Sequence, residues 1–173
     1  VTSVGVSPCT FDECAQALGI KGYESSRISE AMENFGGNIG MCVEYLENES
    51  LRVITSLTKR AADSIISRDE YSLLTVMSSA ELKDRHMSAV FLEMLDRIIR
   101  DCTALKFNKS ASLISCYPKG AEKLADSISV KSAEKIHNLL NTAAADVRAN
   151  VNSILLMSAL CGDCLLYTSP SPR

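Results

Sequence analysis

The sequence predicts an all-α protein, and three observations support this prediction. The chain has 8 glycines and 4 prolines among 173 residues, so the tight turns that join short strands are scarce. Apolar residues recur every three or four positions along most of the chain, which is the helical period. Apolar residues make up 46% of the chain and charged residues 23%, a balance that supports a buried core and excludes an intrinsically disordered protein.

Three short helices are predicted in the first 50 residues. The first follows Thr10, which has capping-box spacing to Glu13. The second spans about 25–34 and is broken by a Gly-Gly pair, after which Asn38 is well placed to cap the third. The apolar residues of the three helices are Phe11, Cys14, Ala15, Leu18, Ile28, Ala31, Met32, Phe35, Ile39, Cys42, Val43 and Leu46.

Longer helices are predicted beyond residue 50. The first spans about 51–65, and Ser67 with Glu70 is expected to cap the next one. The longest amphipathic stripe runs from Met87 to Leu105, so this helix should be central to a bundle. A polar loop is expected at 106–112, and the remaining helices are expected at 121–126, 136–147 and 151–159.

Both ends of the chain are unusual. It begins at Val1 without a methionine, inside a β-branched stretch, so we interpret the sequence as a fragment. From Cys164 to Arg173 the composition changes abruptly and resembles the translated read-through of a sequencing adapter. We therefore interpret residues 162–173 as a sequencing or cloning artefact and exclude them from the fold prediction.

Composition also bears on location and partners. The longest apolar run, 153–161, is interrupted by serines and is far shorter than the roughly 20 residues of a membrane span. Seven irregularly spaced cysteines cannot all pair, and no secretion signal opens the chain, so a cytoplasmic protein with reduced thiols is expected. The 18 basic side chains are interleaved with 21 acidic ones and form no nucleic-acid-binding stripe.

Common catalytic and metal-binding motifs are absent from the sequence. It has no Gly-x4-Gly-Lys-Ser/Thr phosphate loop, no Gly-x-Ser-x-Gly elbow and no His-Glu-x-x-His zinc helix. His86 and His137 lie on separate predicted helices; a helical enzyme using either one would need a pocket that joins both to an acid.

The cysteines do not indicate a metal site. Cys161-x-x-Cys164 has the spacing of half a zinc site, but no second Cys/His pair matches it. We therefore predict no metal and no cofactor. Cys14, Cys42 and Cys102 fall on apolar helix faces and are predicted to be small core residues.

One glycine-rich element carries a family resemblance. Taken alone, Gly36-Gly37-Asn38-Ile39-Gly40 is a helix break or a phosphate cradle at a helix start. The longer segment from Phe35 to Leu46 resembles the lid of bacterial clamp-loader subunits, an AAA+ family, and most closely its delta-prime branch. The Asn-x-Asn at 150–152 and the leucine-rich helix after it resemble the end of the collar domain in the same family.

The resemblance implies a domain layout. Residues 9–49 would form a three-helix AAA+ lid, and residues 50–161 a helical collar domain for oligomerisation. Residues 1–8 would be the last strand of a nucleotide-binding domain. In ATP-hydrolysing relatives the lid carries Gly-x-x-Arg, the sensor-2 arginine, and Gly40 stands where that arginine would be. Because a hydrogen atom cannot replace a guanidinium that stabilises phosphoryl charge, this lid is expected to lack the sensor-2 function.

The resemblance also implies a function and partners. The chain would be a non-catalytic part of the DNA polymerase III clamp loader, bound to gamma/tau-type and delta-type subunits and indirectly to the sliding clamp and DNA. No membrane partner and no small-molecule substrate are expected. Two predicted helices are apolar around much of their circumference, and the oligomer interface is predicted at Phe91, Met94, Ile98, Asn152 and Leu155. The alternatives are a stand-alone helical binding or regulatory domain and an ATPase clamp-loader subunit of the gamma/tau type.

Overall fold

A computed structural model describes residues 9–168 of the chain; the strand predicted within residues 1–8 and the last part of the tail lie outside the described residues. Helices are the only regular secondary structure of the described part, which has no strand, and this confirms the all-α prediction. The helices are α1 (Phe11–Ile20), α2 (Ser25–Phe35), α3 (Ile39–Glu47), α4 (Glu49–Ser67), α5 (Glu70–Met77), the 3-10 helix η1 (Ala80–Lys83), α6 (Arg85–Phe107), α7 (Pro118–Ser127), α8 (Val130–Arg148) and α9 (Ser153–Thr168).

The chain divides into two compact units between Arg52 and Val53, whereas the sequence analysis places the domain boundary between residues 49 and 50. We call described residues 9–52 the first unit and described residues 53–168 the second unit. Helix α4 starts in the first unit and continues into the second. Only Asn48 separates it from α3, so the boundary predicted between residues 49 and 50 falls within the first turn of α4.

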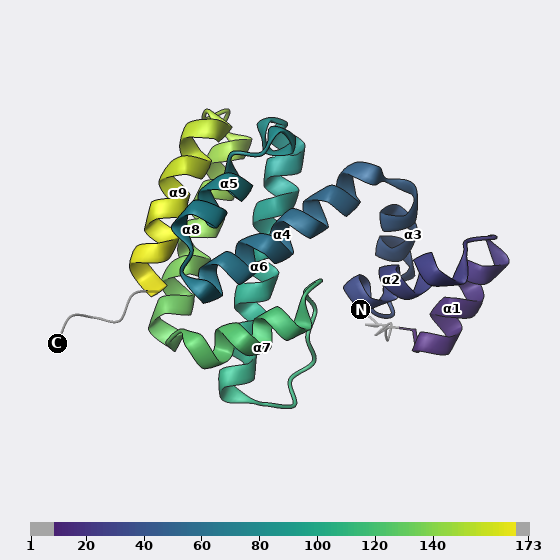
Figure 1. Cartoon of the computed structure of the whole chain (residues 1–173). Helices are drawn as coiled ribbons and strands as arrows, with labels where there is room; N and C mark the ends of the chain where they lie inside the picture. The colour runs from purple at the N-terminus through teal and green to yellow at the C-terminus, as the bar shows by residue number, and fades with distance from the viewer. Residues whose placement is uncertain (1–8, 169–173) are drawn as a thin grey trace, which may run out of the picture. The chain divides into compact units, whose positions relative to one another are not determined.

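The first unit is a three-helix arrangement in which α1, α2 and α3 contact one another (Figure 1). Its helix starts follow the predicted caps. The Thr10 hydroxyl accepts from the Glu13 amide while the Glu13 carboxylate accepts from the Thr10 amide at 2.8 Å. The Asn38 side chain accepts from the Met41 amide at 3.2 Å. The buried core is small and made of Cys14, Leu18, Ile28, Ala31, Met32, Cys42, Tyr45, Leu46 and Leu51.

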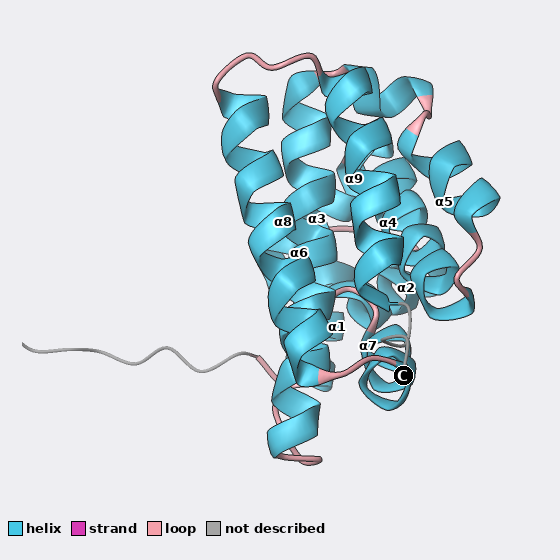
Figure 2. Cartoon of the chain, turned by 90° about the vertical axis from the view of Figure 1, so that its left-hand side faces the viewer, coloured by secondary structure: helices cyan, strands magenta, loops and turns pink. Residues whose placement is uncertain are grey.

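In the second unit α6 is the central helix, as predicted from its long apolar stripe. It packs against α7, α8 and η1, while α9 packs against α8 and α5; Figures 1 and 2 both show α6, α8 and α9 side by side. Phe91, Leu92, Leu95, Ile98, Ile99 and Cys102 of α6 have no exposed surface. Burial of this many large side chains on one helix is the main stabilising contribution in the second unit.

The start of α5 differs from the sequence prediction. Ser67 belongs to the last turn of α4, and Arg68 has a left-handed backbone with φ of 58° that ends this helix. Asp69 is the residue that caps α5, because its carboxylate accepts from the Ser72 amide at 3.0 Å. The residue that caps α5 therefore lies two positions after Ser67, the predicted cap.

A buried carboxylate anchors the loop between α6 and α7. Asp101 is 3% exposed, and its carboxylate accepts from the Ile114 amide and from the Ser115 amide at 2.8 Å. The Tyr117 hydroxyl donates to Asp63 of α4 at 3.0 Å. The loop ends at Pro118, which occupies the first turn of α7 where a missing N–H costs nothing.

Helix α9 continues past the point where the sequence analysis stops. It runs to Thr168, and the Cys164 side chain is fully buried within the second unit. The origin of residues 162–173 as an artefact stays a prediction. No helix within residues 9–168 combines the length and the apolar character needed to cross a membrane.

Candidate functional site

The glycine element that carries the family resemblance forms the turn between α2 and α3. Gly36 has φ of 56° and ψ of −135°, a backbone conformation in which a side chain would be strained. Its amide donates to the Met32 carbonyl at 2.8 Å and closes the end of α2. The first glycine is therefore required by the turn itself.

Gly37 is required for a different reason. A Cβ added at this position would lie 1.9 Å from the carbonyl oxygen of Cys9, a distance that no folded structure tolerates. The α2–α3 turn and the segment that enters α1 thus touch backbone to backbone. Any side chain at residue 37 would push these two segments apart, so Gly37 fixes the packing of the first unit.

Gly40 is not constrained in this way. It is exposed in the first turn of α3, and a Cβ there would meet only the Asn38 side-chain oxygen, at the ordinary contact distance of 3.5 Å. A larger residue would be sterically acceptable. Crowding therefore does not explain why residue 40, where the resemblance implies a sensor-2 arginine in ATP-hydrolysing relatives, is a glycine.

Two cysteine thiols lie beneath the same element. Cys14 of α1 and Cys42 of α3 are both fully buried, and both S–H groups point to the Gly36 carbonyl, with S–O distances of 3.9 and 3.7 Å. Burial raises the pKa of the Cys42 thiol to about 12 and also raises the pKa of Cys14. Both thiols are neutral core groups, and with fully buried Cys102 they confirm the sequence interpretation of these three cysteines.

Two arginines hold the opposite end of α3. The Arg27 guanidinium donates to the Leu46 carbonyl at 2.7 Å, and the Arg52 guanidinium donates to the carbonyls of Tyr45 and Leu46 at 3.1 Å. The last carbonyls of a helix have no partner inside it and carry partial negative charge, so two guanidinium groups there satisfy and neutralise them. Sequence reasoning missed this role, because neither arginine follows α3 directly.

The two histidines do not form a common site. His137 of α8 contacts Asp96 of α6, with 2.5 Å between Nδ1 and the carboxylate, and Asn141 lies against the same ring. His86 sits at the start of α6, ten residues before Asp96 and hence about 15 Å away along the helix. A hollow of about 180 Å³ beside the pair is lined by Leu92, Glu93, Asp96, Arg97, Arg100, Leu140, Asn141 and Ala144. No hydroxyl or thiol lines this hollow, so no nucleophile stands beside the histidine. The contact between His137 and Asp96 joins α8 to α6.

Among residues 9–168 no three His, Cys, Asp or Glu side chains come close enough together to hold a metal ion. Cys161 and Cys164 are both buried in α9, and the Cys161 thiol lies 3.9 Å from the Glu70 carbonyl of α5. Burial raises the pKa of Cys164 to about 12, so this thiol is neutral at ordinary pH. The Cys-x-x-Cys spacing here serves helix packing.

The predicted oligomer interface is only partly at the surface. Phe91, Met94 and Ile98 are 0–4% exposed, because α7 and α8 already cover the apolar stripe of α6. These three residues are core residues and not surface groups, and the interface prediction is corrected accordingly. Leu155 of α9 is 69% exposed, and Asn152 is exposed while its side chain accepts from the Ile154 and Leu155 amides.

No protein-family model matches the chain, and no curated protein matches it.

Proposed function

We propose that the chain is a non-catalytic portion of a bacterial clamp-loader subunit of the delta-prime type, comprising the lid and the collar domain, and that it acts in the cytoplasm. The observation that carries the proposal is the order of the two helical units along the chain. A separate three-helix unit bears the Gly36–Gly40 element at its α2–α3 turn, and a larger helical unit follows it directly. This order is the one that the lid and collar of the family imply.

The lid element supports a structural role over an ATPase role. Gly36 and Gly37 meet backbone requirements of the turn, whereas Gly40 leaves room for a side chain and has none. A lid that contributed to phosphoryl transfer would need a cation at this position to stabilise the charge of the phosphates. The ATPase gamma/tau-type alternative is therefore disfavoured by the residue at position 40.

The collar proposal locates the contact surface on α9. This helix buries Met157, Leu160 and Cys161 within the second unit but leaves Ile154 and Leu155 exposed by 52% and 69%. Exposed leucine and isoleucine on a helix that is apolar on most sides are typical of a surface covered in an assembly. We assign subunit contact to this face in place of Phe91, Met94 and Ile98.

Assembly is the direct test. The chain would be mixed with purified bacterial gamma/tau-type and delta-type subunits and examined by native mass spectrometry. We expect a mixed complex that Leu155→Glu abolishes and that Ile20→Glu leaves intact, because Ile20 is an exposed apolar residue of the first unit. A chain that stays monomeric with these partners would contradict the proposal and would favour a stand-alone helical regulatory domain. Equal assembly of both variants would contradict the α9 contact surface alone.

ATP turnover provides a second test. The purified chain should neither bind ATP tightly nor hydrolyse it, and Gly40→Arg should restore neither property, because the phosphate loop is also absent from this sequence. Measurable hydrolysis by the unmodified chain would overturn the non-catalytic role.

A further inference from the structure

Two adjoining hollows lie at one end of the second unit, where α6 begins and α8 turns into α9. The first has a volume of about 410 Å³ and is lined by Lys83, Arg85 and the residues from Asn150 to Ile154. The second has a volume of about 530 Å³ and is lined by Asp84, Arg85, His86, Ala89, Val90, Glu93, Val147 and Arg148. Arg85 lines both, so the two hollows are neighbours. We call the two together the α6–α9 groove.

The backbone of the α8–α9 turn shapes the first hollow. Asn150 has a left-handed backbone with φ of 70°, which reverses the chain directly after α8. The reversal leaves Val151 and Ile154 exposed by 43% and 52% beside the cations of the α6 start. The second hollow takes its apolar surface from the half-buried Ala89 and Val90, while Val147 beneath them is fully buried. The groove therefore joins apolar walls to a charged rim.

The charge of the rim is positive once its internal pairs are taken into account. Arg148 forms an ion pair with Glu93, so these two charges offset each other. The Asp84 carboxylate accepts from the Met87 amide at 2.9 Å and caps α6. Within residues 9–168, the side chains of Lys83 and Arg85 have neither a hydrogen-bond nor an ion-pair partner, and both residues are exposed. Lys83 and Arg85 with Asp84 leave a net charge of +1 on the rim, beside the exposed valine and isoleucine side chains.

We propose that the α6–α9 groove binds a short extended peptide segment of a partner protein that carries both carboxylates and at least one large apolar side chain. The carboxylates face Lys83 and Arg85, where charge complementarity favours them. The apolar side chain enters the second hollow, whose volume exceeds that of a leucine or phenylalanine side chain. The inference needs none of the clamp-loader partners, but the groove shares Ile154 with the α9 face to which subunit contact is assigned above, so a subunit bound to that face would compete with the peptide.

A nucleic-acid strand fits the groove less well. Strand binding relies on a long basic track and on aromatic side chains that stack with bases. The groove has only two cations without an ion-pair partner, and no phenylalanine, tyrosine or tryptophan lines either hollow. Its apolar walls match a peptide side chain better than a phosphate backbone.

Peptide selection on the intact chain tests the proposal. A random dodecapeptide phage library would be selected on the whole protein, and the most enriched peptide would be synthesised with fluorescein for anisotropy titration. We expect enriched sequences that combine acidic and large apolar residues, and binding that weakens as salt is raised. The Lys83→Glu/Arg85→Glu double variant should weaken binding about tenfold or more. Ile154→Asn should also weaken peptide binding, but the dependence of binding on salt should change little, because this substitution removes an apolar contact and no charge.

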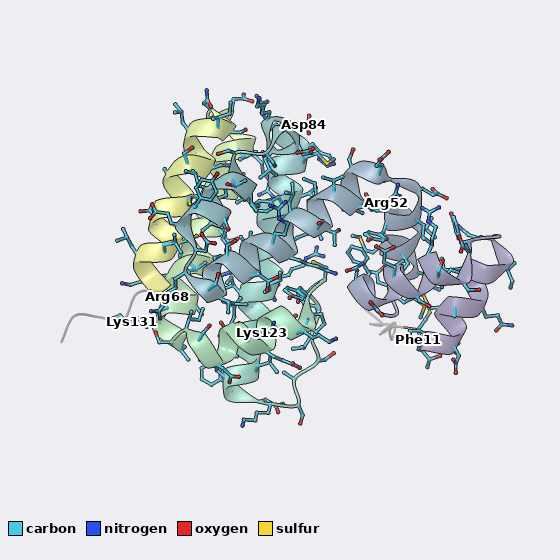
Figure 3. The ribbon with its side chains drawn as sticks, in the orientation of Figure 1. Phe11, Arg52, Arg68, Asp84, Lys123 and Lys131 are labelled. Carbon is cyan, nitrogen blue, oxygen red and sulfur yellow. The ribbon has the colours of Figure 1, made fainter. Side chains whose placement is uncertain are left out.

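The matched control carries the same charge change elsewhere in the same unit. Lys119 and Lys123 are exposed on α7, and Figure 3 shows Lys123 and Asp84 toward opposite ends of the second unit. Lys119→Glu/Lys123→Glu should leave peptide affinity unchanged. The proposal is overturned if enriched peptides lack acidic residues, if none is enriched, if both double variants bind equally, or if fluorescein-labelled oligo-dT binds the groove more tightly than the peptide.

Discussion

The first unit has helices of 9 to 11 residues and carries eight acidic but only three basic side chains, whereas the second unit contains helices of up to 23 residues with a near-equal charge balance. Leu18 is the one first-unit residue among the largest fully buried side chains of the described chain. The first unit is held by backbone contacts at Gly36 and Gly37 and by arginine-capped carbonyls. The second unit is held by burial of leucine, isoleucine and phenylalanine. The difference teaches that the smaller unit depends on local geometry and the larger one on its core.

The largest effect is expected in the core of the second unit. Phe91→Ala removes a fully buried ring at the centre of α6 and should lower the free energy of unfolding of the second unit by about 3–5 kcal/mol. Urea denaturation followed by circular dichroism measures the loss. Phe107→Ala, at a residue 77% exposed, is the matched control and should change stability by less than about 0.5 kcal/mol. A similar effect of both substitutions would contradict the assignment of α6 as the central core helix.

The corresponding test of the first unit adds a single methyl group. Gly37→Ala forces a contact with the Cys9 carbonyl and should destabilise the first unit by about 2–3 kcal/mol. Gly40→Ala adds the same methyl group where there is room and should stabilise α3 by up to about 1 kcal/mol, because alanine favours a helix more than glycine does. Hydrogen exchange of the α1–α3 amides reports both changes. Effects of the same sign would show that backbone contact at Gly37 does not hold this unit.

Removal of the Asp101 carboxylate tests the polar contribution to the second unit. Asp101→Ala leaves the Ile114 and Ser115 amides without their acceptor in a buried place and should cost about 2 kcal/mol. The exchange rates of these two amides should rise more than those of the α6 core. Asp126→Ala, at an exposed residue of α7, is the control. Unchanged protection of the 108–117 amides from hydrogen exchange would contradict the role of Asp101 as the anchor of this loop.

The smallest effect is a pH dependence shared by both units. Hydrogen bonds from the Thr10 amide and hydroxyl lower the pKa of Glu13 from its ordinary value of 4.5, and the Ser72 hydroxyl and amide lower the pKa of Asp69 from 3.8. Because the folded-state values are depressed, each cap stabilises its helix fully above the ordinary pKa and loses this contribution as the pH falls through the folded value. Carboxyl NMR titration measures this, and Thr10→Ala should raise the pKa of Glu13. An unchanged titration would show that the cap does not cause the shift.

Much of the helical fold could be predicted from the sequence, because helix caps and apolar periods are local signals. The Thr10–Glu13 capping box and the Asn38 cap are read from residues three apart. The start of α5 was missed because Arg68 adopts a left-handed backbone, which arginine rarely does and which no residue pattern indicates.

The candidate sites were less accessible to sequence reasoning. The apolar stripe of α6 predicts which face is buried but not how many helices cover it, so the pattern alone places Phe91, Met94 and Ile98 at an interface, whereas α7 and α8 pack on this helix. Asp101 lies beside Cys102 on that stripe, and a carboxylate at an inward position was the one available signal of a buried anchor. The α6–α9 groove combines residues from two segments, 83–93 and 147–154, which only the tertiary fold brings together.

Hydrogen exchange with mass spectrometry in increasing urea tests most directly whether the two units are held by different forces. Peptides from α1–α3 and peptides from α6–α8 would be followed in the same unmodified chain. The first unit, with fewer than about 60 residues and a small core, should exchange cooperatively at a lower urea concentration than the second unit. Two separate transitions in this order are the predicted result. A single transition shared by all peptides, or earlier opening of the second unit, would contradict the account.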